Sequence, residues 1–394
     1  MNIKKFLQKR KSPYRNDAPR VRNSYYTFSR EYPSKNILHR RKGVRKRIRR
    51  NRLLKALTGV ICFCLIALMS CFATDLMLKI SYKPLDTSAQ QSQSEDKNVI
   101  SFSEGVRAWY LPTDALSDRD YLKHFVSSVK RRGANAVLID FKDENGRLCY
   151  SSSDETAILS KAAVYDNETV RNALSYIKSK RLSVIARIYC FQDNTASAGN
   201  SALAVTYLDS DVNWLDENGK AWLNPFSKRA RGYVLEILEE TLSFSVDGIM
   251  LEAVSFPYGG ATDTLGYRGQ KDDESRNDVL KSFISSAKKK MPEEKPLFVS
   301  LTATDAVKGS KAKYEGSISK NAADGLSVYV AQSPDGYIID KKSKYQSLMS
   351  LLSKISSSAS ENAEIVPVLE GDTYSRSLKR ALMKNGYRSF IVTE

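Results

Sequence analysis

The fold of this chain is decided by short apolar stretches such as residues 136–141, which read Ala-Val-Leu-Ile-Asp-Phe. A short, mainly apolar run of this kind is typical of a buried β-strand. Seven similar runs lie at residues 106–111, 182–190, 247–252, 297–302, 326–331, 365–370 and 390–393. Segments with helical spacing separate them, so the sequence predicts eight strands that alternate with helices.

This alternation over roughly 250–300 residues is typical of an α/β protein with a TIM-like (β/α)8 barrel. Its weakest part is the fifth crossover, residues 303–325, which shows no strong helical pattern. An open doubly wound sheet is the alternative, but it would need a Gly-rich phosphate loop. The sequence contains neither a GxGxxG nor a Walker motif.

Local signals add detail to the expected barrel. The first helix should open at the capping pattern Ser117-x-x-Asp120 and end at Gly133. Hairpin tips are expected at two Asn-Gly pairs, residues 145–146 and 218–219.

Positive charge is concentrated at the start of the chain. Residues 1–55 hold 20 of the 62 Lys and Arg residues and only Asp17 and Glu31 of the 44 acids. The rest of the chain is balanced, so the net charge of +18 belongs to this tail. Charge is therefore no argument for nucleic-acid binding by the folded part, and no nucleic-acid partner is expected. We interpret residues 1–55 as a disordered cytoplasmic tail, with contact to anionic lipid as a natural extension.

A run of 19 residues without charge follows the tail, at residues 56–74. At 1.5 Å per residue it spans roughly 28 Å, close to the thickness of the hydrocarbon core of a bilayer. We therefore expect one transmembrane helix over residues 56–78, because a core helix would show a polar face and a signal peptide would begin near the N-terminus. The Lys and Arg residues before it predict a single-pass protein of the cell membrane, with the tail inside and the C-terminal domain extracellular.

Residues 79–98, rich in Ser and Gln, are expected to form a flexible polar linker, which leaves 99–394 for the barrel. Of the cysteines beyond the expected span, Cys149 and Cys190 are predicted to be free and buried. The sequence has no CxxC pair, so it gives no signal for a redox site or a zinc ribbon.

The small number of histidines excludes several classes of enzyme. Only His39 and His124 are present, which rules out HExxH zinc hydrolases and other sites that need several imidazoles. A Ser-His-Asp triad would have to use one of these two, and neither has a suitable place. We expect neither a metal nor a cofactor.

Active sites of (β/α)8 barrels lie at the C-terminal ends of the strands. The acids at those ends are the predicted catalytic residues Asp140, Glu252 and Glu370. The predicted substrate-binding residues are Asp143, Arg187, Trp109, Trp222 and Asn224. Two carboxylates suffice for glycoside hydrolysis, one as acid and the other as base or nucleophile, and aromatic rings suit the C–H faces of sugars.

Each candidate also has a structural interpretation. Asp140 and Arg187 could form a buried ion pair, Asp143 could cap the turn before the hairpin, and Trp109 could belong to the core. Glu252 and Glu370 are harder to explain in this way, because each ends a buried strand where an unpaired carboxylate is costly.

Four segments in the same order resemble the bacterial family of putative glycoside hydrolase domains. They read Asn-Ala-Val-Leu-Ile-Asp-Phe-Lys-Asp at 135–143, Val-Ile-Ala-Arg-Ile at 184–188, Ala-Trp-Leu-Asn-Pro-Phe at 221–226 and Asp-Gly-Ile at 247–249. The resemblance is strong across residues 133–260 and weaker toward the C-terminus. It implies a TIM barrel and a glycoside hydrolase-like activity that is poorly defined within the family.

The sequence departs from the family pattern near the predicted site. At the fourth strand the family reads Phe-Asp-Tyr-Val-Arg-Phe-Pro, whereas residues 251–257 read Leu-Glu-Ala-Val-Ser-Phe-Pro. The acid is kept as Glu252, while Ala253 and Ser255 replace the Tyr and the Arg. The Asp usual at the end of the fifth strand is replaced by Thr302. These changes alter both the charge balance and the substrate contacts.

Two hypotheses follow from the sequence. The first is a membrane-tethered extracytoplasmic glycoside hydrolase-like enzyme that acts on a cell-wall or surface polysaccharide, with Glu252 working beside Glu370 or Asp140. The second is a catalytically degenerate barrel that binds glycan, or a protein partner, without cleavage.

Overall fold

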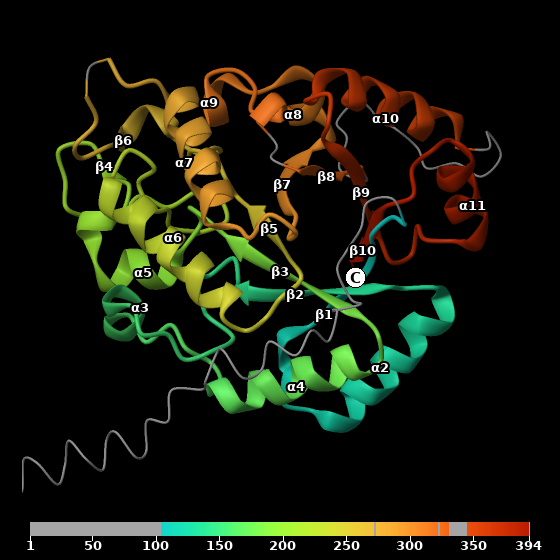
Figure 1. The fold of residues 1–394 in the computed structure, drawn as a ribbon. Coiled ribbons are helices and arrows are strands. Elements are labelled where there is room, and N and C mark those ends of the chain that lie inside the picture. Colours follow the sequence, from blue (N-terminus) through green and yellow to red (C-terminus); the bar gives the residue numbers. More distant parts are fainter. Residues whose placement is uncertain (1–103, 272, 322–323, 331–344, 394) are drawn as a thin grey trace, which may run out of the picture. The chain divides into compact units, whose positions relative to one another are not determined.

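The computed structural model describes residues 104–271, 273–321, 324–330 and 345–393 (Figure 1). The basic tail, the expected span at 56–78 and the linker at 79–98 all lie outside these residues. Ser94–Glu394 forms one compact unit, which holds everything described below. No helix in the described part of the chain is long and apolar enough to cross a membrane.

Eight parallel strands close into a barrel, in the order β1-β10-β9-β8-β7-β5-β3-β2. They are β1 (Arg107–Leu111), β2 (Ala136–Lys142), β3 (Ser183–Tyr189), β5 (Gly248–Glu252), β7 (Leu297–Thr302), β8 (Gly325–Tyr329), β9 (Glu364–Glu370) and β10 (Phe390–Thr393). Pairing of β1 with β10 completes the ring. The eight predicted strands and the TIM-like barrel are thus confirmed, and the open sheet is excluded.

Helices surround the barrel on its outer side (Figure 1). The longer ones are α2 (Arg119–Arg132), α4 (Asn167–Ser179), α6 (Lys228–Leu242), α7 (Arg276–Lys290), α10 (Gln346–Ser358) and α11 (Arg376–Lys384). The shorter ones are α3 (Glu155–Leu159), α5 (Asn194–Gly199), α8 (Ala303–Lys308) and α9 (Lys311–Tyr314). Single 3-10 turns lie at η1 (Thr113–Leu116), η2 (Ser201–Leu203), η3 (Thr262–Thr264) and η4 (Ser319–Asn321). The weak fifth crossover therefore contains two short helices, α8 and α9.

The apolar residues form two cores, as expected for a barrel with an outer ring of helices. Inside the barrel, side chains such as Leu138, Ile185, Met250 and Phe298 pack into one buried cluster. A larger cluster fills the space between the strands and the helices. The barrel interior is therefore packed, and a site can form only above this layer, at the mouth.

The start of α2 differs from the expectation. Asp118, not Ser117, is the N-cap, and its Oδ1 accepts hydrogen bonds from the backbone N–H groups of Asp120 and Tyr121. The Ser117 hydroxyl instead donates to the Asp114 carbonyl. An ionised carboxylate stabilises the positive end of a helix more strongly than a hydroxyl does.

The loop after β2 is fixed to the loop after β3 at the barrel mouth. The buried Lys142 ammonium lies 2.8 Å from Asp193 Oδ2, and both side chains are fully buried. Asp193 also caps α5. The predicted hairpin tip at 145–146 packs against it: a Cβ on Gly146 would lie 1.8 Å from Asp193 Oδ1, and the residue has a φ of +81°. Only glycine fits this close approach.

The long excursion after β3 carries the second predicted hairpin tip. The turn at residues 216–220 is closed by the Gly219 N–H, which donates to the Asp216 carbonyl. A two-stranded antiparallel sheet, β4 (Thr206–Tyr207) with β6 (Leu265–Gly266), joins this excursion to the loop after β5. These loops build the walls of the site.

Candidate active site

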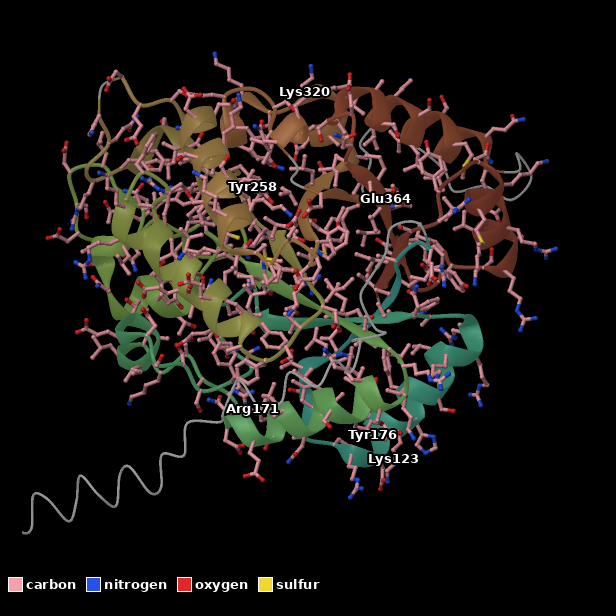
Figure 2. The ribbon with its side chains drawn as sticks, in the orientation of Figure 1. Lys123, Arg171, Tyr176, Tyr258, Lys320 and Glu364 are labelled. Atoms are coloured by element: carbon pink, nitrogen blue, oxygen red, sulfur yellow. The ribbon has the colours of Figure 1, made fainter. Side chains whose placement is uncertain are left out.

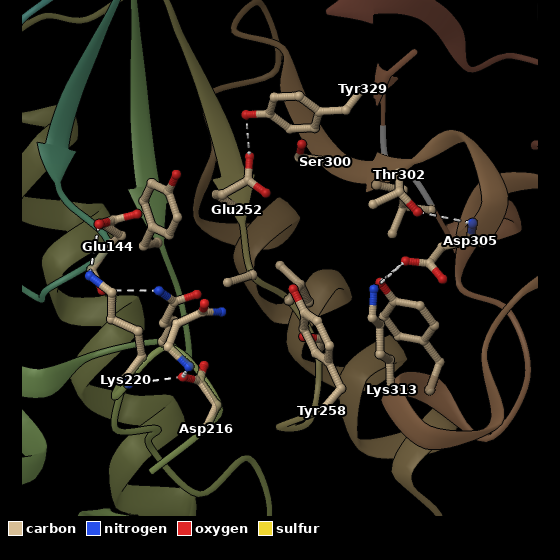
Figure 3. A pocket seen from close by; sticks show the side chains of 18 of the residues that line it. Glu144, Asp216, Lys220, Glu252, Tyr258, Ser300, Thr302, Asp305, Lys313 and Tyr329 are labelled. Carbon is tan, nitrogen blue, oxygen red and sulfur yellow. Dashed lines mark hydrogen bonds and ion pairs between the residues drawn. The ribbon is translucent and has the colours of Figure 1, made fainter. Parts of the chain in front are cut away.

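A cavity of about 520 Å³ opens at the C-terminal mouth of the barrel (Figure 3). The ends of β3, β5, β7 and β8 form its floor, where Arg187, Glu252, Ser300 and Tyr329 line it. This is the end of the barrel at which the sequence predicted a site.

Glu252 is the carboxylate at the floor of the cavity. Its Oε2 accepts a 3.1 Å hydrogen bond from the Tyr329 hydroxyl, and within the described residues it forms no ion pair. Burial raises the pKa of Glu252 above that of an ordinary glutamate, although the Arg187 charge and the Ser300 and Tyr329 hydroxyls act in the opposite direction. A carboxyl group of this kind suits proton donation.

Asp140 and Arg187 form the buried ion pair that was one of the sequence interpretations. Arg187 Nε and one terminal nitrogen donate to the two carboxylate oxygens of Asp140, at 2.5 and 2.9 Å. Tyr110 adds a 3.0 Å hydrogen bond to Asp140 Oδ2. Burial favours the neutral form of Arg187, but the Asp140 carboxylate outweighs burial and raises the pKa of Arg187 well above its ordinary value. The guanidinium therefore stays charged.

Arg187 also connects the pair to Glu252. Its other terminal nitrogen donates to the Tyr329 hydroxyl at 3.2 Å, and Tyr329 in turn donates to Glu252. Asp140, Arg187, Tyr329 and Glu252 therefore form one continuous polar chain across the barrel mouth. Such chains fix the orientation of each member, because moving one breaks the bonds of the next.

Asp305 supplies a second carboxylate to the cavity, and the sequence analysis missed it. It lies in the first turn of α8, and its Oδ2 is 2.7 Å from the Lys313 ammonium. The same ammonium lies 4.0 Å from the centre of the Tyr258 ring. Tyr258, Lys313 and Asp305 thus form a stack along one wall (Figure 3).

The opposite wall is formed by the loops after β2 and β3. Lys220 Nζ donates to Glu144 Oε1 at 2.8 Å and to Asn145 Oδ1 at 2.7 Å, which joins the two loops (Figure 3). Trp222 does not face the cavity. It is buried, donates to Asp216 Oδ2 at 3.0 Å, and meets the Tyr258 ring edge-on at 5.7 Å. It therefore supports residues that line the cavity.

The three departures from the family pattern all lie at this cavity. Ala253 has a φ of +51°, a left-handed conformation that is unusual for a residue with a Cβ. Ser255 also lines the cavity. Thr302 caps α8, since its Oγ1 accepts the Asp305 N–H at 3.1 Å. The carboxylate of the family pattern is absent at Thr302, but Asp305 supplies a carboxylate three residues later.

Ser300 places a second hydroxyl beside Glu252 at the floor of the cavity. It is 4% exposed, and its Oγ has no hydrogen bond of standard geometry within the described residues, although it is close enough to lower the Glu252 pKa.

A second cavity of about 340 Å³ adjoins the first at the mouth. Three residues line both cavities and separate them: Arg187, Tyr189 and Glu144. The second cavity alone is lined by Asp140 and Asp143. Asp143 mainly caps the hairpin turn, because its Oδ1 accepts the N–H groups of residues 145 and 147 at 2.9 and 2.8 Å.

Besides Trp222, three predicted site residues line neither cavity at the mouth. Glu370 ends β9 with an exposed side chain and is not among the residues that line either cavity at the mouth. Trp109 lies in the core, edge-on to Tyr374 and Phe390. Asn224 is fully buried, and its side chain bonds the Arg268 carbonyl at 2.9 Å, a contact that holds a loop.

Both described cysteines, Cys149 and Cys190, are buried and free, as predicted. In the part of the chain that the structure describes, no cluster of three or more His, Cys, Asp or Glu side chains could hold a metal ion.

The fold and the site define a (β/α)8 barrel with carboxylates at its mouth. Residues 108–311, about half of the chain, match the family described as the putative glycosyl hydrolase domain, and the chain belongs to this family. No curated protein matches the chain.

Several solved structures match part of this chain. A hypothetical protein from Ruminiclostridium thermocellum is 24% identical, with a TM-score of 0.44 over 48% of this chain and 96% of that one. The glycoside hydrolase domain of PelA from Pseudomonas aeruginosa is 14% identical, with a TM-score of 0.40 over 73% and 94%. A family 20 exo-β-N-acetylglucosaminidase from Vibrio harveyi is 10% identical, with a TM-score of 0.46 over 74% and 50%, so the match spans half of that chain.

Proposed function

We propose that this chain is a membrane-tethered, extracytoplasmic glycoside hydrolase that acts on a polysaccharide of the cell wall or cell surface. The observation that carries the catalytic part is Glu252, a carboxyl group with a raised pKa and no ion-pair partner among the described residues, at the floor of the mouth cavity. The tether is supported by the uncharged run at 56–74 and the positive charge before it.

Glu252 serves as the general acid and Asp305 as the second carboxylate. As the glycosidic bond breaks, Glu252 gives its proton to the leaving oxygen. Either Asp305 takes a proton from the water that attacks the anomeric carbon, or Asp305 attacks this carbon itself and a water that gives its proton back to Glu252 then hydrolyses the glycosyl-enzyme. Asp305 replaces Glu370 in this role because it lines the same cavity as Glu252. The stereochemistry of the first product, read by NMR, distinguishes the two routes.

The test compares two Glu-to-Gln variants of the full chain. Peptidoglycan and surface polysaccharides are screened for release of reducing ends. Glu252→Gln should lower turnover by about 100-fold or more, the typical contribution of a positioned acid. Glu370→Gln is the matched control, since it removes an exposed carboxylate from a strand end outside the cavity, and it should leave turnover unchanged. Equal losses in both variants would contradict the assignment.

A second candidate function is glycan binding without cleavage. The observation that favours it is the bidentate ion pair of Asp140 with Arg187, which occupies one of the predicted catalytic carboxylates. In that case no substrate is cleaved, and Glu252→Gln weakens glycan affinity by about 1–3 kcal/mol, the cost of leaving a buried polar group unpaired. Binding and cleavage are therefore scored separately.

The proposed topology has its own test. Protease added to intact cells should remove the C-terminal domain and spare the basic tail. The opposite pattern would contradict the topology and leave the catalytic proposal to be judged on turnover alone.

A further inference from the structure

Positive side chains gather at the N-terminal end of the barrel, opposite the cavity. The C-terminal ends of α2 and α4 and the helix α11 with the turn after it meet around the start of β1 (Figure 1). They supply six side chains that we call the basic patch: Arg131, Arg132, Arg181, Lys379, Lys384 and Arg388. All are exposed except Lys379, which is partly buried.

Contacts between the elements show that the patch is one continuous surface. Arg107 Nε donates to the Gly133 carbonyl at the end of α2, and the same two residues line a shallow hollow with Lys379 and Arg388. The Tyr374 hydroxyl, just before α11, donates to the carbonyl of the last residue of α2 at 3.4 Å.

The end of α4 joins the same surface. Lys130, near the end of α2, donates to the carbonyl of Lys180, which follows α4, at 2.5 Å. Arg181 is the next residue along the chain. The patch therefore runs from α11 across the end of α2 to the end of α4.

The charge of the patch is not neutralised within the described residues. Five of its six members, all except Arg388, form no ion pair there. Burial, and then the charge of Arg107, lower the pKa of Lys379. Among the described residues, two acids lie beside the patch: Glu104 lines the hollow, and the partly buried Glu364 (Figure 2) interacts with Arg388 and Ser389.

This excess is more than the usual preference for cations at helix C-termini. The last turns of α6 and α10 contain no basic residue. At the end of α7, Lys288 is paired with Asp324 at 2.6 Å and Lys290 with Glu239 at 2.5 Å. Lys289, the other cation of that turn, forms no ion pair within the described residues, so unpaired positive charge is more abundant around β1 than at the ends of α6, α7 and α10.

We propose that the basic patch binds the surface of an anionic phospholipid membrane and holds the barrel with its cavity facing away from the bilayer. This inference rests on the membrane tether of the proposed function. Glu104, three residues before β1, lines the hollow of the patch, so the segment that leads into β1 passes the patch. The 25 residues at 79–103 that follow the expected span can reach at most roughly 85 Å, so they keep an anchored barrel close to its membrane.

The orientation follows from the topology of the barrel. The patch lies at the N-terminal ends of the parallel strands and the cavity at their C-terminal ends. A barrel bound through the patch therefore presents its cavity to a polymer outside the membrane.

The test uses the full chain in two kinds of vesicle. One is phosphatidylcholine alone, and the other contains roughly 30% phosphatidylglycerol, which makes its surface anionic. Hydrogen–deuterium exchange is measured at the ends of α2, α4 and α11. In the anionic vesicles these ends should exchange at least about tenfold more slowly, since each basic residue near the surface strengthens binding about fivefold. High salt should abolish the protection.

Two variants with equal loss of charge locate the binding surface. The patch variant carries Arg131→Gln, Arg132→Gln, Lys379→Gln and Lys384→Gln, and it should lose the protection. The control variant carries Lys161→Gln, Lys228→Gln, Arg229→Gln and Lys311→Gln, all exposed and outside the patch, and it should keep it. Both should cleave a soluble glycan as the native chain does.

Several results would overturn the proposal. They are equal exchange in the two kinds of vesicle, protection that survives in the patch variant, or loss of the protection when equimolar RNA is added, which would assign the patch to nucleic acid. Flotation at high salt tests the tether separately, because a chain without a membrane span would not float with phosphatidylcholine vesicles under these conditions.

Discussion

The Tyr329 hydroxyl donates a 3.1 Å hydrogen bond to Glu252 Oε2 and accepts one from Arg187 at 3.2 Å. It thereby joins the general acid of the proposed site to a buried, ion-paired cation. The bond to Tyr329 lowers the Glu252 pKa and partly offsets the effect of burial.

Removing this hydroxyl should shift the pH profile of turnover. Tyr329→Phe removes a hydrogen bond that favours ionised Glu252, so the Glu252 pKa should rise and the alkaline limb of kcat should move to higher pH. The control is Tyr110→Phe, whose hydroxyl bonds Asp140 instead. A shift of equal size in both variants, or a shift to lower pH, would contradict this role.

The raised Glu252 pKa should also appear in the stability of the protein. Below about pH 4.3, the ordinary glutamate value, the carboxyl is protonated in both the folded and the unfolded chain. Between that value and the raised folded pKa, the unfolded chain releases its proton, whereas the folded chain keeps it because its surroundings keep the group neutral. The unfolding free energy of the native chain should therefore fall relative to that of Glu252→Gln. Urea unfolding from pH 4 to 8 measures the difference, and a difference that grows in favour of the native chain would refute the sign.

Breaking the ion pair at the mouth should be more costly than replacing it. Asp140→Asn leaves the Arg187 guanidinium without its counter-charge and should reduce the unfolding free energy by about 3–5 kcal/mol. The double variant Asp140→Leu with Arg187→Met replaces both charges with apolar groups and should lose less. Denaturant titration compares the two, and a larger loss in the double variant would argue against a mainly electrostatic cost.

Two glycines separate backbone strain from steric clash. Gly146 and Gly219 have φ values of +81° and +71°, so alanine is strained at both. A Cβ at Gly146 would meet Asp193, whereas nothing lies within 4 Å of one at Gly219. Gly146→Ala should therefore reduce the unfolding free energy by about 1–3 kcal/mol more than Gly219→Ala does. Equal losses would mean that the hairpin moves away from Asp193 without cost.

Most of the barrel could be predicted because its buried strands are apolar runs, and because helices with one apolar face separate them. Of the residues at the barrel mouth, those that belong to the strands could be predicted. Asp140, Arg187 and Glu252 sit in or at the end of strands, and a closed barrel brings such positions together whatever the loops do.

The remaining parts of the site depend on contacts that one sequence does not contain. Asp305 lies beyond its strand, in a crossover without a clear helical pattern, although the spacing Thr302-x-x-Asp305 is a capping pattern that could have located it. Glu370 was predicted at the site but does not line the cavity. An apolar run marks where a strand ends, but not the direction in which its last side chain points. The pairing of Lys142 with Asp193 joins the end of β2 to the loop after β3, and this contact exists only after folding.

The closure of β1 on β10 also determines when this domain can become complete. The Val106 N–H donates to Ser389 Oγ across 283 positions of the chain, and Arg107 lies in register with Phe390. Until the segment around Phe390 has been synthesised, one edge of β1 has no strand to pair with. Joining segments so far apart in the chain is also slow for entropic reasons. The domain is therefore exposed to proteases and to pairing with other chains throughout its synthesis, and it becomes resistant only when the last strand is in place.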